Sequence, residues 1–185
     1  MWLVGDAQRL PDLRAAAARL PGPRGAAGVL ARDQAPGVMV GLARLCRARG
    51  RVLLVAGDGR AALRLRAGLH VPDRRAAAGL LPFLLARRGG APWARLTVAV
   101  HGRAGLARGR RLRADAGLVS PAFPTLSHPG AAALGPHRWA RLAGSCRRGL
   151  PGVIALGGVA PATAGRLPGW ANGLAAIGAL VAIRQ

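Results

Sequence analysis

The sequence contains no lysine, no glutamate and no tyrosine. All 28 basic side chains are arginines and only six aspartates oppose them, so the formal net charge is +22. A chain with this charge attracts phosphates, nucleic acid and anionic membranes without specificity. The arginines are spread along the chain without a heptad or interleaved aromatic residues. We therefore interpret them as solvated helix faces, and no specific nucleic-acid partner is predicted.

Cysteine and aromatic residues are also scarce. Cys46 and Cys146 are far apart and outside any CxxC pattern, so neither a disulfide framework nor a zinc site is predicted, and a reducing, cytoplasmic setting fits best. Two phenylalanines and four tryptophans supply aromatic recognition only sparsely, and the tryptophans are expected in the core or at its edge.

No apolar run is long enough for a membrane helix. Between residues 149 and 183 only Arg166 is charged, but prolines and glycines break the uncharged stretches, each of which is shorter than about 20 residues. Near the N-terminus, Asp6 comes too early for the apolar region of a secretory signal, so none is expected. The hydropathy is that of buried strands, and no membrane association is predicted.

The hydrophobic content of the sequence is typical of a folded domain. The 185 residues are 51% hydrophobic, enough to bury a sizeable core without disulfide or metal crosslinks. No linker or composition shift divides the chain, so a single domain over residues 1–185 is predicted.

Short strand-like runs alternate with Ala/Leu/Arg segments of helical spacing, which is typical of βα units around a parallel sheet. Eight units in this length give about 23 residues each, fewer than in an ordinary barrel of this kind. The predicted fold is α/β, a compact (β/α)8 TIM barrel, with a doubly wound open sheet as the runner-up. The predicted strands are Trp2–Val4, Gly28–Ala31, Val52–Ala56, Gly68–Val71, Leu96–Val100, Ala116–Val119, Val153–Leu156 and Leu174–Ala176. The predicted helices are Leu10–Leu20, Val38–Arg49, Arg60–Arg66, Arg74–Arg87, Arg103–Arg113, His137–Arg147, Thr163–Leu167 and Ile177–Ile183, of which the third and seventh are short.

Residues 118–130 leave a predicted strand and become a loop rich in proline and hydroxyl groups. Three prolines restrict its backbone, so Thr125, Ser127 and the His128 imidazole are candidates for a preorganised set of donors to an anion. Loops that follow barrel strands carry the chemistry in this fold. The competing interpretation is that proline, serine and threonine only form turns here.

Glycine-bearing turns follow the last two predicted strands. Gly157 and Gly158 follow the seventh, and Ile177 and Gly178 follow the eighth. The backbone N–H of a glycine can approach a phosphate closely, and barrels commonly bind phosphate after these two strands. Because glycine is abundant, at 28 residues, a plain tight turn stays the alternative for each.

Together these segments resemble the thiamine phosphate synthase family and its TenI-like relatives, almost from end to end. The most specific match is Ser-Pro-Ala-Phe-Pro-Thr-Leu-Ser-His-Pro-Gly at 120–130, which is similar to the family's Gly/Ser-Pro-x-Phe-Pro-Thr-x-Thr/Ser-Lys/His segment. Ala-Leu-Gly-Gly-Val at 155–159 and Gly-Leu-His-Val at 68–71 resemble the family's Ala-Ile-Gly-Gly-Ile and Gly-Val-His-Leu.

The resemblance implies a barrel transferase that couples hydroxymethylpyrimidine diphosphate with thiazole phosphate and releases thiamine phosphate and pyrophosphate with the help of Mg²⁺. Donors and metal that stabilise the departing pyrophosphate matter more in such a reaction than a nucleophilic side chain. Self-association of the chain is a further expectation. The resemblance implies catalytic roles for Arg32, Thr125, Ser127 and His128, substrate phosphate binding by Gln34, Arg75, Gly157, Gly158, Ile177 and Gly178, and Mg²⁺ ligation by Asp58.

The chain departs from the family pattern at several of these positions. Gln34 stands in place of a lysine, Gly57 in place of an asparagine, and His128 in place of the lysine that ends the hydroxyl loop. Arg75 occupies the expected position of a second metal carboxylate, with Asp73 slightly out of register. An arginine cannot ligate Mg²⁺, but its guanidinium can bind a phosphate bidentately.

Three alternatives to the synthase stay open. The first is a degenerate, noncatalytic barrel that binds a phosphorylated ligand. The second is a TenI-like thiazole tautomerase, which is less favoured because that activity goes with a histidine where this chain has Pro121. The third is a polyanion-binding protein that acts through its charge. His70 and His101 are candidate acid–base groups, although each lies in or at the end of a predicted strand, where a structural role is commoner.

Overall fold

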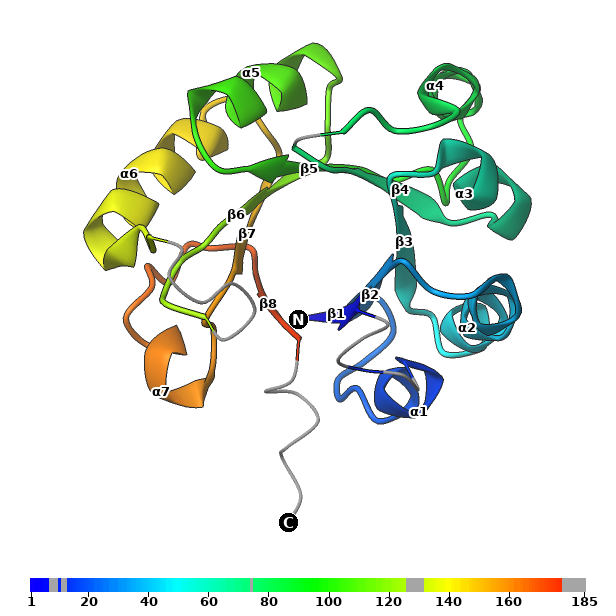
Figure 1. Ribbon diagram of the computed structural model, residues 1–185, viewed down its shortest axis with the longest axis horizontal. Coiled ribbons are helices and arrows are strands. Elements are labelled where there is room, and N and C mark those ends of the chain that lie inside the picture. The colour runs from blue at the N-terminus through cyan, green and yellow to red at the C-terminus, as the bar shows by residue number, and fades with distance from the viewer. Residues whose placement is uncertain (7–9, 11–12, 74, 126–131, 178–185) are drawn as a thin grey trace.

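The computed structural model describes residues 1–6, 10, 13–73, 75–125 and 132–177. Eight parallel strands form a closed barrel in which each strand pairs with the next, as Figure 1 shows. β8 also pairs with β1, with Leu3 opposite Ala176, so the predicted barrel is confirmed and the open sheet was wrong. The strands are β1 (Trp2–Asp6), β2 (Gly28–Arg32), β3 (Val52–Ala56), β4 (Gly68–Val71), β5 (Leu96–Val100), β6 (Ala116–Val119), β7 (Gly152–Leu156) and β8 (Gly173–Ala176).

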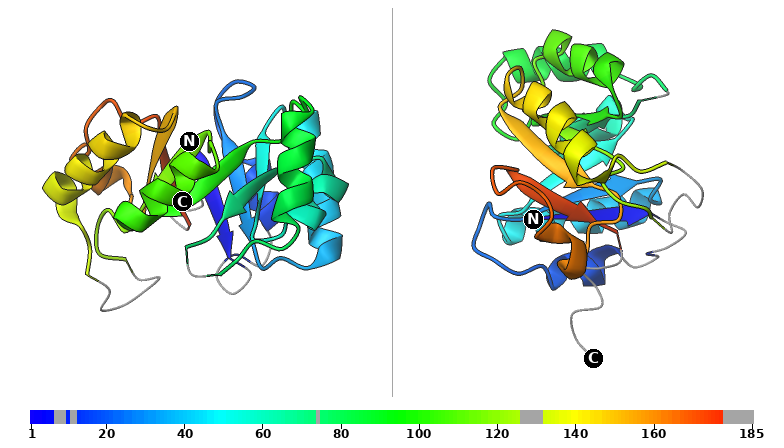
Figure 2. Two further views of the ribbon diagram at one scale, coloured as in Figure 1. Left: turned by 90° about the horizontal axis from the view of Figure 1, so that it is seen from above. Right: turned by 90° about the vertical axis from the view of Figure 1, so that its left-hand side faces the viewer.

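Helices alternate with the strands and surround the barrel (Figures 1 and 2). None of the helices in the described part of the chain is long and apolar enough to cross a membrane. They are α1 (Leu13–Ala18), α2 (Pro36–Ala48), α3 (Gly59–Leu65), α4 (Leu80–Arg88), α5 (Arg103–Arg111), α6 (Gly135–Arg147) and α7 (Pro161–Ala164).

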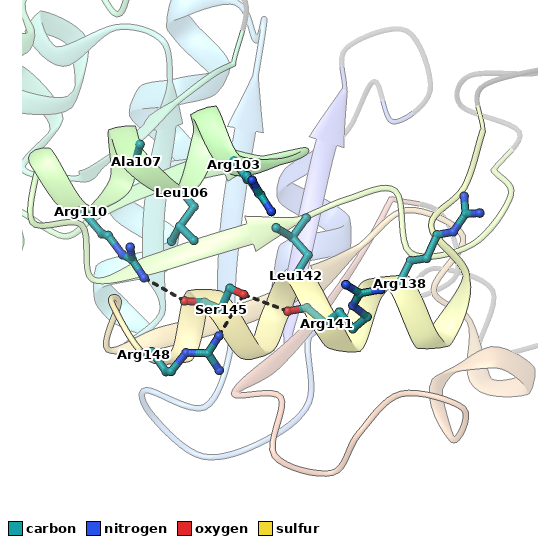
Figure 3. A pocket seen from close by; sticks show the side chains of 9 residues that line it. All are labelled: Arg103, Leu106, Ala107, Arg110, Arg138, Arg141, Leu142, Ser145 and Arg148. Carbon is teal, nitrogen blue, oxygen red and sulfur yellow. Dashed lines mark hydrogen bonds between the residues drawn. The ribbon is translucent and has the colours of Figure 1, made fainter.

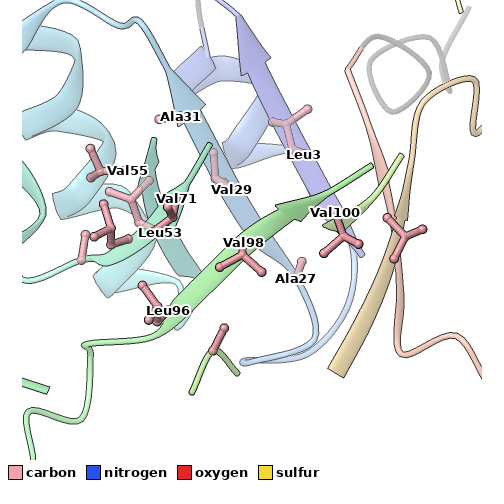
Figure 4. Close-up of a cluster of buried hydrophobic side chains, with 14 of the residues drawn as sticks. Leu3, Ala27, Val29, Ala31, Leu53, Val55, Val71, Leu96, Val98 and Val100 are labelled. Carbon is pink, nitrogen blue, oxygen red and sulfur yellow. The ribbon is translucent and has the colours of Figure 1, made fainter. Parts of the chain in front are cut away.

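Alternation along the strands divides the buried side chains into two sets. One set packs beneath the helices and includes Leu3, Val29, Leu53, Leu96 and Val98, which Figure 4 labels. The other set fills the interior of the barrel. Both faces of each strand are thus buried, which explains why several strands are apolar throughout. The interior cluster consists of Val4, Leu30, Leu54, Ala116, Leu118, Ile154 and Ala175.

The fourth helix was predicted to start at Arg74, which is wrong, because α4 starts at Leu80. The preceding backbone is used for other bonds: Ala78 donates its N–H to the carbonyl of Gly57 at 2.9 Å and accepts the N–H of Gly59 at 2.6 Å. Gly79 then adopts a left-handed φ of 61°. These bonds and this turn place the start of the helix after residue 79.

Smaller differences concern the other helices. The first predicted helix is shorter than expected at both ends, and α7 covers Pro161–Ala164 instead of Thr163–Leu167. Proline at the first helical position and the Thr163 hydroxyl, which accepts the N–H of Ala160 at 2.9 Å, set the start of α7 earlier. The predicted eighth helix lies outside the described residues except for Ile177.

Candidate active site

The candidate site lies at one rim of the barrel. Because all eight strands are parallel, their carboxyl ends lie at the same end of the molecule (Figure 2). Ser127, His128 and Gly178 lie outside the described residues. All the other predicted site residues are at the rim: Arg32 and Gln34 at the end of β2, Asp58 after β3, Arg75 after β4, Thr125 after β6, Gly157 and Gly158 after β7, and Ile177 after β8.

An ion pair joins two of the rim loops. Arg75 Nη2 lies 3.3 Å from Asp33 Oδ1, with the two side chains 66% and 75% exposed. A Cβ placed on Gly57 would lie 3.5 Å from the same Arg75 nitrogen, so the guanidinium also borders the turn after β3. An ion pair this exposed contributes little to stability. Its consequence is positional, because it holds a cation beside the loops that follow β2 and β3.

Gln34 faces its own loop. Its side-chain Nε2 donates to the backbone carbonyl of Arg32 at 3.3 Å, and both residues are half-buried. The Gln34 amide therefore stabilises the backbone at the end of β2. Within residues 32–34, the positive charge is that of Arg32.

The loop after β6 packs against the turn after β7. Ala122 donates its N–H to the carbonyl of Leu156 at 2.9 Å, and Phe123 donates to the carbonyl of Gly157 at 3.0 Å. Gly157 has a left-handed φ of 91°, and a Cβ on it would lie 2.9 Å from Pro121. Glycine is therefore required for the close approach of these two loops. Contact between the glycines and a phosphate stays a prediction.

A family model for thiamine monophosphate synthase matches residues 30–180, which is most of the chain. The chain belongs to this family. No curated protein matches the chain by sequence.

Solved structures agree with the fold of the thiamine monophosphate synthase family. The chain is similar to thiamine phosphate pyrophosphorylase from Pyrococcus furiosus, with a TM-score of 0.73 and 19% identity over 96% of this chain and 84% of that chain. It is also similar to 2-keto-3-deoxy-6-phosphogluconate aldolase from Zymomonas mobilis, with a TM-score of 0.58 and 17% identity over 95% of this chain and 79% of that chain. At these identities the likeness shows the fold alone.

The resemblance to thiamine phosphate synthases implies Mg²⁺, and the rim carboxylates show what kind of site this chain offers. Asp58 Oδ1 accepts the N–H of Ala61 at 2.9 Å and caps α3, while its second oxygen takes no part in that bond. Asp73 is held instead by Arg108, whose Nη2 lies 2.9 Å from Asp73 Oδ1 and whose Nη1 donates to the Asp73 carbonyl at 3.1 Å. The described residues contain no group of three or more His, Cys, Asp or Glu that could hold a metal ion. They fit a site with one protein carboxylate, completed by substrate phosphates, which is a common way for proteins to bind Mg²⁺.

Sequence reasoning missed a polar pair inside the barrel of this family member. His70 on β4 and Thr97 on β5 are in register, and His70 Nδ1 lies 2.9 Å from Thr97 Oγ1. Burial, followed by the charges of Arg32, Arg108 and His101, lowers the pKa of His70 to about 3. The imidazole is therefore neutral at physiological pH. The signal was present in the sequence, since these two polar residues interrupt apolar strands.

His101 follows β5 at the rim and is exposed. Its Nδ1 lies 2.8 Å from the backbone carbonyl of Ser120 and 3.3 Å from the Ser120 hydroxyl. A carbonyl oxygen can only accept, so Nδ1 carries a hydrogen. These contacts fix the orientation of the His101 ring at the mouth of the barrel and point Nε2 away from Ser120.

Proposed function

We propose that this chain is a transferase that joins hydroxymethylpyrimidine diphosphate to thiazole phosphate and yields thiamine phosphate and pyrophosphate. The bond between the pyrimidine methylene carbon and the diphosphate oxygen breaks, and the diphosphate leaves with the electron pair. The thiazole nitrogen donates its lone pair to the methylene carbon and forms the new C–N bond. Such a reaction requires stabilisation of the departing negative charge and needs no nucleophilic side chain.

The observation that supports the proposal most is the placement of Arg32, Asp58, Arg75 and Thr125 at one rim, in a chain whose family match covers residues 30–180. These residues come from four separate loops or strand ends, yet the parallel barrel brings them to the same end of the molecule. Charged and hydroxyl groups can therefore act on one substrate there.

The arginines have the main role in stabilising the leaving group. A guanidinium is planar, stays charged and can bind two phosphate oxygens at once, so Arg75 and Arg32 are suited to neutralise the diphosphate. Thr125 adds a hydroxyl donor from the loop after β6, and Ser127 and His128 are proposed to extend this donor set.

Asp58 is proposed as the protein ligand for Mg²⁺. The bond from Ala61 fixes its carboxylate at the start of α3, so its position does not depend on a bound ion. A Mg²⁺ ion bound there would neutralise oxygens of the leaving diphosphate as a Lewis acid.

The thiazole phosphate is proposed to bind after β7, at Gly157 and Gly158, and after β8, at Ile177 and Gly178. These strands are neighbours in the barrel, with Leu156 opposite Ala175, so Gly157 and Ile177 follow neighbouring strand ends. Two substrates can then occupy adjacent parts of the same rim.

A barrel that only binds a phosphorylated ligand is the second candidate. Two observations favour it: the Asp73 carboxylate is paired with Arg108, and the Gln34 side chain is hydrogen-bonded to the Arg32 carbonyl of its own loop. An aldol reaction through a Schiff base is not a candidate despite the structural likeness to an aldolase, because that chemistry requires a lysine amine and the sequence has no lysine.

We place the activity in the cytoplasm, which the two buried free thiols of Cys46 and Cys146 support.

The proposal is tested by measuring pyrophosphate release from purified protein with each substrate alone and with both. We expect release only when both substrates and Mg²⁺ are present, and a loss of about 10²-fold or more in Arg32→Ala and Thr125→Ala. Saturable binding of thiazole phosphate with no release above background would support the binding-only barrel instead.

A further inference from the structure

A second feature of the molecule lies on its outer surface, between two neighbouring helices. A cavity of about 500 Å³ separates α5 from α6, and Figure 3 shows side chains from both helices lining it. Its apolar part consists of the half-buried Leu142 of α6, the exposed Ala107 of α5 and, at its base, Leu106 of α5, which is 7% exposed. Its walls carry five arginines, Arg103 and Arg110 from α5 and Arg138, Arg141 and Arg148 from or next to α6. We call this the α5/α6 groove.

The groove carries concentrated positive charge with no acidic side chain along its lining. In the described residues, Asp33, Asp73 and Asp115 form ion pairs with arginines that do not line the groove. Arg110 donates to the backbone carbonyl of Ser145 at 3.3 Å and Arg148 to the Ser145 hydroxyl at 3.2 Å (Figure 3). These neutral acceptors orient the two guanidinium groups without neutralising them, so the groove is electrostatically complementary to an anion.

The spacing of the lining residues indicates the shape of that anion. Arg103, Leu106 and Arg110 lie on one stripe of α5, so the two arginines are two helical turns, about 10.5 Å, apart. On α6 the pair with the same spacing is Arg141 and Arg148, seven residues apart, and Leu142 lies one turn after Arg138. We propose that the α5/α6 groove docks an acidic amphipathic helix of another protein, with its apolar residues on the two leucines and its carboxylates on the flanking arginines.

Two other occupants fit the groove less well. None of the seven helices in the described residues contains Asp or Glu, so a second copy of this chain has no acidic helix to offer from that part of its structure. Single-stranded nucleic acid is bound through aromatic stacking as well as through phosphate contacts, and no aromatic side chain lines the groove. Charge and apolar surface together favour the helix.

The test uses a fluorescent synthetic peptide of about 15 residues, with leucines at i, i+3, i+4 and i+7 and glutamates on both flanks. Binding to the full chain is measured by anisotropy. A scrambled peptide of the same composition and a labelled single-stranded RNA serve as comparison probes. The groove variant is Arg103→Gln/Arg110→Gln/Arg141→Gln, and the matched control is Arg44→Gln/Arg60→Gln/Arg64→Gln. All six of these arginines are exposed, and both variants lose the same charge.

We expect the groove variant to weaken binding of the amphipathic peptide by about tenfold and the control by less than about twofold. We also expect the scrambled peptide to bind more weakly than the amphipathic one. Equal losses in the two variants, or equal binding of the two peptides, would show attraction to net charge alone and overturn the proposal. Tighter binding of RNA than of the peptide, lost in the groove variant, would assign the groove to nucleic acid and also overturn it. Circular dichroism of each variant confirms that folding is retained.

Discussion

The Arg108 guanidinium on α5 contacts Asp73 twice: it lies 2.9 Å from the Asp73 carboxylate and donates to the Asp73 backbone carbonyl at 3.1 Å. The same guanidinium donates to the carbonyl of Ala99 at 2.8 Å, which connects the loop after β4 to the end of β5. Asp73 therefore has a structural role in this chain. Asp58 is left as the carboxylate to which we assign the metal.

Exchanging each carboxylate for its amide separates these roles. Asparagine is as good a helix N-cap as aspartate, so we expect Asp58→Asn to change the free energy of unfolding by less than about 0.5 kcal/mol. The same variant should lose the Mg²⁺ stimulation of pyrophosphate release, because an amide is a weaker ligand for this cation. Asp73→Asn is the control and should leave the half-saturating Mg²⁺ concentration within about twofold. A larger effect of Asp73→Asn on that concentration would contradict the assignment.

The Asp33–Arg75 pair gives a second prediction. Arg75→Ala should weaken binding of pyrophosphate by about tenfold, and Arg75→Lys should restore little of it, since an ammonium cannot bind two oxygens in a fork. Asp33→Asn removes a competitor for the guanidinium and should leave pyrophosphate binding unchanged or tighter. Isothermal titration with pyrophosphate measures all three variants. Equal weakening by Asp33→Asn and Arg75→Ala would mean that the pair only shapes the loops.

The partly buried ion pair between Arg87 and Asp115 contributes to stability. Arg87 binds both oxygens of Asp115, at 2.6 and 2.7 Å, and Asp115 also accepts the N–H of Leu96 at 2.8 Å. Burial alone would raise the pKa of Asp115, but these hydrogen bonds outweigh it and hold the pKa below its usual value. The stabilisation is therefore present above the pKa of the unfolded chain, near 3.9, and is lost as the pH falls through the lowered pKa. We expect Arg87→Ala to lower the free energy of unfolding by about 2–3 kcal/mol at pH 7 in urea titrations, and by clearly less at pH 3.

His70 gives a different pH dependence. Its pKa of about 3 in the folded protein lies below the 6.5 of an unfolded chain, so the unfolded state binds the extra proton between these values. Stability should fall as the pH decreases below 6.5, by up to about 1.4 kcal/mol per unit from this group. We expect His70→Gln to flatten this slope in urea titrations between pH 7 and 4, whatever its effect at pH 7. A slope in His70→Gln as steep as that of the wild type would contradict this assignment.

The strands were predictable because burial on both faces leaves a plain signal. Runs such as Leu96–Val100 are confirmed with the same bounds, since they combine apolar side chains with flanking turn residues. The short α3 and α7 also exist, and Asp58 caps the first of them. The closed order of the strands followed from the count of βα units.

What was missed depends on contacts between distant segments. The start of α4 is set by backbone bonds between Ala78 and the turn after β3, and local helical spacing gives no sign of them. The capture of Asp73 by Arg108 joins residues 35 positions apart. An arginine-rich sequence offers many partners for each aspartate, so spacing alone could not select this one.

We propose that the rim of this barrel couples two substrates. The most direct measurement incubates the protein with both substrates and Mg²⁺ and quantifies thiamine phosphate by chromatography and pyrophosphate by an enzymatic assay in the same samples. We expect one mole of thiamine phosphate for each mole of pyrophosphate, over many turnovers, with both products lost in Arg75→Ala. Pyrophosphate without thiamine phosphate, or neither product despite bound thiazole phosphate, would contradict it.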